Sequence, residues 1–371
     1  MNSVPGSMPR IILTGFCNEV LFGYFVGSFH LTAITSCGWF SNMNKNIKLI
    51  LNYVVGPVVF CILLYSIYSQ LQRQPDWKQS LLLIWQLING TDGWKILMVF
   101  LLMFVNWGIE ARKWQVAIRR IQHVSFYKAL RAIFSGTTLG FFTPNRTGEY
   151  LGRIWYIKEG SRIQAISLTL VCSMAQLLVT LLAGCVGIYF LRSQVLAIAQ
   201  GSSSLAWWLL VIQYAALFSV LLLSFLYFRL SWMIRLVEKL PLPERWVRNI
   251  RVLDNFNATH LLRILSLSVL RYLVFILQYY ILLNVFGVTV NWWQTFWSIS
   301  VVFLIMAIVP TLAFLTELGV RWKASIELIS VYSTNLAGIF ATSVTIWAIN
   351  LVIPALIGSL LILGIKFFRN K

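Results

Sequence analysis

The sequence predicts an all-α, polytopic membrane protein with about six full spans and two re-entrant hairpins arranged as an inverted repeat. Three observations support this fold class. Hydrophobic residues occupy 59% of the 371 positions, charged residues occupy only 11%, and the apolar residues form long runs. Soluble globular domains carry charged residues at about a quarter of their positions, so that class of protein is excluded.

The apolar runs define the expected spans, because a transmembrane helix needs about 20 apolar residues. Segments of suitable length are Lys48–Tyr68, Trp94–Ala111, Gln164–Leu191, Leu205–Phe228, Ile264–Phe286 and Leu336–Ile365. Two further apolar segments, Ala132–Thr143 and Trp292–Val309, run directly into stretches that contain Pro, Glu, Gly and Arg. The first is too short to cross the bilayer and return, and a re-entrant hairpin fits both.

These two interrupted stretches are Phe141–Arg153 and Pro310–Arg321. Both keep the order Pro, Glu, Gly, Arg, although the spacing between these residues differs. Broken, charged helices in corresponding halves of a membrane protein are typical of transporter binding sites. Irregular backbone at membrane depth also needs protein or water around it. We therefore expect both stretches to border a shared internal cavity.

The distribution of Lys and Arg indicates the orientation of the spans. With a cytoplasmic N-terminus, the segments expected inside hold 22 of the 30 basic residues, and those expected outside hold six. Cytoplasmic loops of membrane proteins carry this kind of excess. The first hairpin is then expected to enter from the cytoplasm and the second from the opposite face. Orientation and contact with anionic lipids account for the net charge of +19 without nucleic acid.

The chain is expected to hold one membrane domain, residues 43–371. Residues 1–42 are a doubtful N-terminal extension, because they contain no clear signal-peptide cleavage site. The run Met43-Asn-Lys-Asn-Ile-Lys48 has the features of a natural start. The five Cys residues are scattered without a CxxC pair, which supports neither a disulfide framework nor a zinc site.

The first interrupted stretch is the main candidate substrate site. Pro144 is expected to precede a new helix, and the exposed N–H groups of Thr147 and Gly148 would attract an anion. The guanidinium groups of Arg146 and Arg153 suit phosphate oxygens. Glu149 would orient one of these Arg residues or carry a proton during transport. An alternative is that Glu149 and Arg153, four residues apart on one helical face, only neutralise each other.

The second stretch supplies Pro310, Glu317 and Arg321 as further candidates. Mutual neutralisation of Glu317 and Arg321 is the favoured alternative for this pair. Arg271 lies within a predicted span, where a charged side chain is costly and is expected to serve a function unless it reaches the interface. The run Glu110-Ala-Arg-Lys113 lies at a span end, so Arg112 and Lys113 are interpreted as topology anchors.

Residues that carry a family resemblance are Asn106–Trp114, Phe134-Ser-Gly, and Thr143-Pro-Asn-Arg-Thr-Gly-Glu-Tyr-Leu-Gly-Arg153. These segments resemble the lysylphosphatidylglycerol synthase transmembrane region, also called the flippase-like domain. The likeness covers most of the chain from about Met43 onward, and it implies translocation of lipid between leaflets. In the second half the family often reads Gly-Leu-Gly followed by Arg-Glu, whereas this chain has Glu317-Leu-Gly-Val-Arg321-Trp322, which weakens the case for Glu317. Larger relatives carry a soluble aminoacyl transferase domain that has no counterpart here, so synthase activity is not expected.

The sequence contains no hydrolytic, transferase, nucleotide-binding or metal-binding motif, so no catalytic residue, metal or cofactor is expected. The leading hypothesis is a lipid translocator of the bacterial inner membrane. It would move a phospholipid or a lipid-linked headgroup. One alternative is an intramembrane glycosyl- or acyl-transferase, or an accessory subunit of a lipid-modifying enzyme, and another is a small-solute transporter. Expected partners are membrane lipids and a separate lipid-synthesising enzyme, while a homodimer is left open.

Overall fold

The structure is a computed structural model that describes residues 65, 93–143, 146–198, 203–229, 257–309 and 314–363. The chain divides into two compact units, and all of these residues lie in the unit formed by residues 53–366. Within this described part, every regular element is a helix. The predicted all-α class is therefore confirmed.

Five stretches of helix are long and apolar enough to cross a membrane. They correspond to α4 (Gly93–Ile118), α7 (Arg162–Ile198), α8 (Ser203–Phe228), α11 (Ala258–Val285), and the continuous run α14 (Leu336–Trp347), η6 (Ala348–Val352) and α15 (Ile353–Leu363). Each coincides with a predicted span, which confirms a polytopic membrane protein. The predicted span Lys48–Tyr68, apart from Tyr65, and the doubtful extension 1–42 lie outside the described residues.

Shorter helices lie between these spans. They are α5 (Phe126–Phe141), α6 (Gly148–Ile154), the 3-10 turn η4 (Glu159–Ser161), α12 (Trp292–Ile308) and α13 (Phe314–Ile329). Asn291 begins α12 with a capping box, in which its side chain and that of Gln294 satisfy each other's backbone N–H groups. The predicted breaks at Pro144 and Pro310 lie outside the described residues, between α5 and α6 and between α12 and α13.

Helices α5 and α6 fold back on each other at very short range. A Cβ atom built on Gly152 would lie 2.5 Å from Gly136 Cα, and one built on Gly148 would lie 2.4 Å from the Leu139 carbonyl oxygen. The two contacts pair residues in opposite directions along the chain, as an antiparallel hairpin requires. Small residues allow helix backbones to approach closely in membranes. The glycines of the two helices are therefore what brings α6, and the charged residues on it, against α5.

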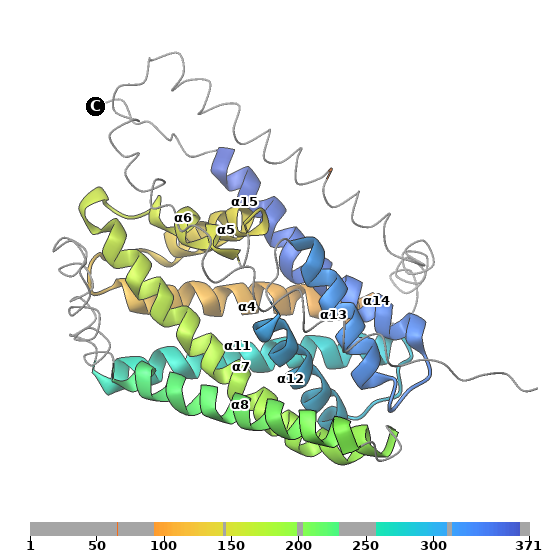
Figure 1. Cartoon of the computed structure of the whole chain (residues 1–371). Coiled ribbons are helices and arrows are strands. Elements are labelled where there is room, and N and C mark those ends of the chain that lie inside the picture. The colour runs from red at the N-terminus through yellow and green to blue at the C-terminus, as the bar shows by residue number, and fades with distance from the viewer. Residues whose placement is uncertain are drawn as a thin grey trace, which may run out of the picture. The chain divides into compact units, whose positions relative to one another are not determined.

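Helices α4, α7 and α15 pack against this hairpin (Figure 1). Helix α15 packs against α5, and a Cβ on Gly358 would clash with the Phe134 carbonyl oxygen. Helix α4 packs along α11, and α7 packs against both α12 and α8. The outer surface of α8 is apolar, with Trp207, Tyr214 and Phe218 each at least 66% exposed. Such a surface suits a helix that faces lipid.

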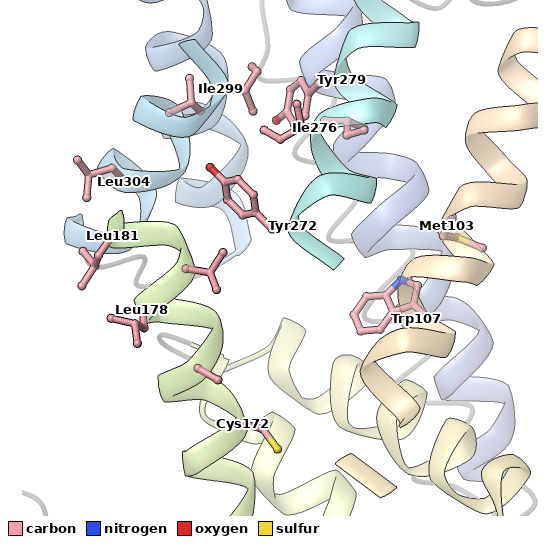
Figure 2. Packing of buried hydrophobic residues seen from close by; sticks show 14 of the residues in the cluster. Met103, Trp107, Cys172, Leu178, Leu181, Tyr272, Ile276, Tyr279, Ile299 and Leu304 are labelled. Carbon is pink, nitrogen blue, oxygen red and sulfur yellow. The ribbon is translucent and has the colours of Figure 1, made fainter. Parts of the chain in front are cut away.

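The apolar core connects α4, α7, α11 and α12. Figure 2 shows Tyr272, Ile276 and Tyr279 of α11 in one interior region with Ile299 and Leu304 of α12 and with Leu178 and Leu181 of α7. The Tyr272 hydroxyl and Ser300 Oγ are 2.8 Å apart, so the one polar atom of this ring has a partner on α12. Tyr and Trp need such partners when they are buried. This core holds α11 in place beside the charged residues described below.

A substitution at the glycine contact tests the hairpin. Gly152→Ala places a methyl group against the backbone of Gly136, so we expect a loss of about 1–3 kcal/mol of stability from overpacking. Thermal unfolding of the detergent-solubilised protein measures this as a lower Tm. Gly160→Ala is the matched control, because a Cβ there meets no atom within 4 Å. Equal Tm values for both variants would contradict the close approach of α5 and α6.

Candidate functional site

The centre of the candidate site is the carboxylate of Glu110, which α4 holds in the interior with 4% of the residue exposed. Three cationic side chains surround it. Lys113 Nζ lies 2.7 Å from Oε2, Arg271 Nη1 lies 3.0 Å from the same oxygen, and Arg153 Nη1 lies 3.3 Å from Oε1. A charge inside a membrane protein needs partners of this kind, because burial without them is very costly.

Each cation reaches Glu110 from a different part of the chain. Lys113 lies one helical turn after Glu110 in α4, so both side chains are on one face of that helix. Arg271 comes from α11, which packs along α4. Arg153 comes from α6, and its Cγ would lie only 3.1 Å from a Cβ on Gly136. The glycine at position 136 thus leaves the space through which Arg153 extends toward α4.

The charged residues continue outward from Arg153. Its Nη2 lies 2.8 Å from Glu149 Oε2, and Arg146 Nε lies 2.6 Å from Glu149 Oε1. Side-chain exposure rises along this series, from 4% for Arg153 to 18% for Glu149 and 37% for Arg146. We call Lys113, Glu110, Arg271, Arg153, Glu149 and Arg146 the central charge network. It leads from the buried carboxylate of Glu110 to the accessible guanidinium of Arg146.

Arg146 has an unusual backbone conformation. Its φ angle is +57°, which makes it the non-glycine residue with positive φ in the described part of the chain. Left-handed conformations of such residues cost about 1–3 kcal/mol and occur preferentially at binding sites. The conformation comes directly before the turn into α6 and aims the side chain at Glu149.

A chain of amide side chains supports the central charge network. Arg271 Nε donates to Asn106 Oδ1 at 3.0 Å, and Asn106 donates to Asn350 Oδ1 at 3.2 Å. Asn350 in turn donates to Gln278 Oε1 at 3.1 Å, and Gln278 donates to the Val99 carbonyl at 2.9 Å. Asn350 belongs to η6, a π-helical segment, and such segments are frequent at functional sites. Buried polar chains of this kind fix side-chain orientation.

The second predicted stretch forms a smaller charged group. Arg321 Nη2 lies 2.8 Å from Glu317 Oε1, and Arg321 Nη1 donates to the Tyr279 hydroxyl at 2.9 Å. Arg321 is 8% exposed and Glu317 is 6% exposed, so both are buried. An ion pair between Glu317 and Arg321 is what the hypothesis of mutual neutralisation predicts. Tyr279 of α11 was not a candidate in the sequence, although it fixes the guanidinium of Arg321.

The two stretches approach each other in the fold. Phe141 at the end of α5 and Leu318 in α13 belong to one buried apolar cluster, together with Trp347 of α14. The first and second stretches therefore border the same interior region, although 165 residues separate Arg153 from Leu318 in sequence.

The structure thus joins four predicted residues, Arg146, Glu149, Arg153 and Arg271, in one network, while Glu317 and Arg321 form a separate pair nearby. Pro144 and Pro310 lie outside the described residues.

The N–H of Gly148 donates to Thr143 Oγ1 at 2.6 Å, so that backbone group is already engaged. Thr147 is exposed. Side chains, rather than the backbone at the start of α6, therefore carry the charge of this site.

The interpretation of Lys113 as a topology anchor was wrong, because its side chain is only 1% exposed and pairs with Glu110. Arg112, by contrast, is exposed. Glu110 and Lys113 were noted at the span end, and Asn106 lies within the same span, but none of the three was assigned to the site. Their spacing was a usable signal, since Asn106 lies four residues before Glu110 and Lys113 three residues after it, all on one helical face.

Neither group of charged residues suggests a metal centre. Across the described residues, no three or more His, Cys, Asp and Glu side chains gather where they could hold a metal ion.

Removing the Glu110 charge should destabilise the fold strongly. Glu110→Gln keeps the shape but leaves Lys113, Arg153 and Arg271 without their shared anion, so we expect a loss of about 3–5 kcal/mol. Thermal unfolding of the solubilised protein measures the change. Glu327→Gln is the matched control at an exposed position. A second substitution, Lys113→Met, should recover part of the loss, and an unchanged Tm in Glu110→Gln would contradict the central role of this carboxylate.

Comparison with known proteins agrees with this architecture. Among curated proteins, none matches the chain. The family model described as "Lysylphosphatidylglycerol synthase TM region" matches residues 53–358, which include every described helix from α4 through α14 and part of α15. The match covers well over half of the 371 residues. The chain therefore belongs to the lysylphosphatidylglycerol synthase transmembrane region family.

Proposed function

We propose that the protein translocates a phosphate-bearing lipid, either a phospholipid or a lipid-linked headgroup, between the two leaflets of the membrane. The observation that carries the proposal is the charge balance of the central charge network. Four basic side chains, Lys113, Arg271, Arg153 and Arg146, face two carboxylates, Glu110 and Glu149, which leaves an excess of two positive charges.

An excess of positive charge in a membrane interior favours an anionic ligand, because charged groups there need a counter-charge. The increase in side-chain exposure from Arg153 to Arg146 indicates that such a ligand would arrive at the Arg146 end of the network. Arg146 is the most accessible member, and its recorded ion pair engages Nε, at the inner edge of the guanidinium. A phosphate could take the two terminal nitrogens as a bidentate partner. The acyl chains would remain among the apolar helices, in contact with the bilayer.

The broken helices supply a route for this movement. In the proposal, α5 with α6 and α12 with α13 are re-entrant hairpins of an inverted repeat, and the interior region between them receives the headgroup. The shared apolar cluster of Phe141 and Leu318 supports a joint interior for the two halves. The family match supports a lipid-related role in a membrane. The protein would work without catalysis, as a multi-pass protein of a bacterial inner membrane that receives lipid from a separate synthesising enzyme.

The proposal predicts that Arg146 is needed for lipid movement but little for folding, since it lies at the exposed end of the network. In proteoliposomes that contain a fluorescent phosphatidylglycerol, Arg146→Gln should slow lipid translocation at least about tenfold, the equivalent of one lost charge-assisted contact. Dithionite quenching of the outer-leaflet fluorophore measures the rate.

The matched control is Arg131→Gln, which removes the same charge from an exposed position on α5. It should translocate lipid at the unsubstituted rate. Tm values for both variants check that they fold. Unchanged translocation in a folded Arg146→Gln variant would refute the assigned role, and no translocation by the unsubstituted protein above protein-free liposomes would refute the function itself.

A further inference from the structure

A second basic site lies away from the central charge network, at the end of α4. The structure has a cavity of about 380 Å³ there, between the turn that follows α4 and the first turns of α11. We call it the end cavity. Its lining includes four Arg and two His residues, which are Arg112, Arg119, Arg120, His123, His260 and Arg263.

The end cavity concentrates positive charge. Four of its lining residues are Arg, and none of the described lining residues is acidic. Arg112 Nη1 donates to the neutral side chain of Gln115, and Arg120 Nη2 lies 3.3 Å from His260 Nε2. The partner of Arg112 is an uncharged amide, so this contact does not neutralise the charge of that guanidinium. The cavity therefore keeps a positive potential that would attract an anion.

Neutral contacts fix the shape of the end cavity. Gln115 Nε2 donates to the Val124 carbonyl at 2.7 Å, which ties the turn back to α4. The Gln122 side chain accepts from the Lys158 backbone N–H at 3.1 Å, which joins the same turn to the segment after α6. Val124 itself is buried. These two interactions of the wall do not use the Arg side chains.

Membrane orientation alone does not explain this arrangement. The rule that basic residues are enriched on the cytoplasmic side requires only that they lie in cytoplasmic loops or span ends, without a particular arrangement in space. Lys128 and Arg131 on α5 satisfy that requirement, yet neither lines the end cavity, and Arg131 lies over the Tyr127 ring at 4.6 Å. Arg119 and Arg263, in contrast, converge on one hollow from segments separated by more than 140 residues of sequence. Convergence of this kind indicates recognition of a ligand.

We propose that the end cavity binds the phosphate group of an anionic ligand, independently of any lipid translocation by the central charge network. Its volume lies within the usual range of about 300–1,000 Å³ for small-ligand sites. Several guanidinium groups around one hollow suit the oxygens of a phosphate. Basic pockets between membrane helices on the cytoplasmic side bind anionic lipid headgroups. A phosphorylated lipid headgroup and a soluble phosphate share the recognised chemistry, and the experiment separates them.

The test compares two double variants of the full chain. Arg119→Gln with Arg263→Gln removes two charges from the end cavity, and Lys128→Gln with Arg131→Gln removes two charges from the exposed surface of α5. All four side chains are exposed, so both variants should fold, and Tm measurements check this. Native mass spectrometry in a neutral detergent measures binding of phosphatidylglycerol and of phosphatidylcholine. Isothermal titration calorimetry measures binding of inorganic pyrophosphate.

In the cavity variant, binding should be at least about tenfold weaker, because two charge-assisted contacts are lost. The α5 variant should bind within about twofold of the unsubstituted protein at physiological ionic strength. Loss of phosphatidylglycerol binding in the cavity variant alone supports the site with a lipid ligand. Loss of pyrophosphate binding in that variant alone supports it with a soluble ligand. Three outcomes would overturn the proposal. Binding could be weakened equally in both variants, or it could be unchanged in the cavity variant. The unsubstituted protein could also bind phosphatidylglycerol and phosphatidylcholine with equal affinity and fail to bind pyrophosphate.

Discussion

The burial of the Glu110 carboxylate constrains the rest of the described structure. A carboxylate transferred to a low-dielectric interior costs several kcal/mol unless opposite charges and hydrogen bonds compensate it. The compensation comes from α4 itself, from α6 and from α11. Three helices from different parts of the chain, α4, α6 and α11, must therefore be packed in their correct positions before any of these charges can be buried. This requirement explains why polar amides extend the contact through Asn106, Asn350 and Gln278, instead of leaving Arg271 to apolar neighbours alone.

The glycine contacts and the charges depend on each other. Gly136 and Gly152 let α6 approach α5 so closely that Arg153 reaches α4, and the attraction of Arg153 to Glu110 and Glu149 in turn holds α6 there. Helix α6 has only seven residues, too few to be stable by itself. Its position is thus a tertiary property, determined by close packing on one face and by ion pairs on the other. The strained backbone at Arg146 lies at the point where this short helix must begin.

Most of the fold could be predicted because membrane burial leaves a direct trace in sequence. Long apolar runs gave the spans now seen as α4, α7, α8, α11 and the α14–α15 run. The candidate site was recognised in part: Arg146, Glu149 and Arg153, which the structure joins by ion pairs, stood out because charges interrupt an apolar segment. Lys113 was misassigned because a basic residue at a span end usually anchors topology, and only the packing of other helices against α4 decides between exposure and burial. The pairing of Arg321 with Tyr279 depends on a contact between residues 42 positions apart in different helices, which no local pattern encodes.

The π-helical segment η6 has a consequence for the last span. A π turn contains more residues than an α turn, so it shifts the rotational phase of everything that follows it. Before the π-helical segment, α14 packs against α11 and α13. After it, α15 packs against α5: the Ala355 carbonyl accepts a hydrogen bond from Thr138, and Gly358 lies against Phe134. Within a single crossing, the span therefore serves two different neighbours with two differently phased faces. A deletion of one residue between 348 and 352 would convert the segment toward regular α-helix and rotate one of these faces away from its neighbour, although composition and hydropathy would barely change.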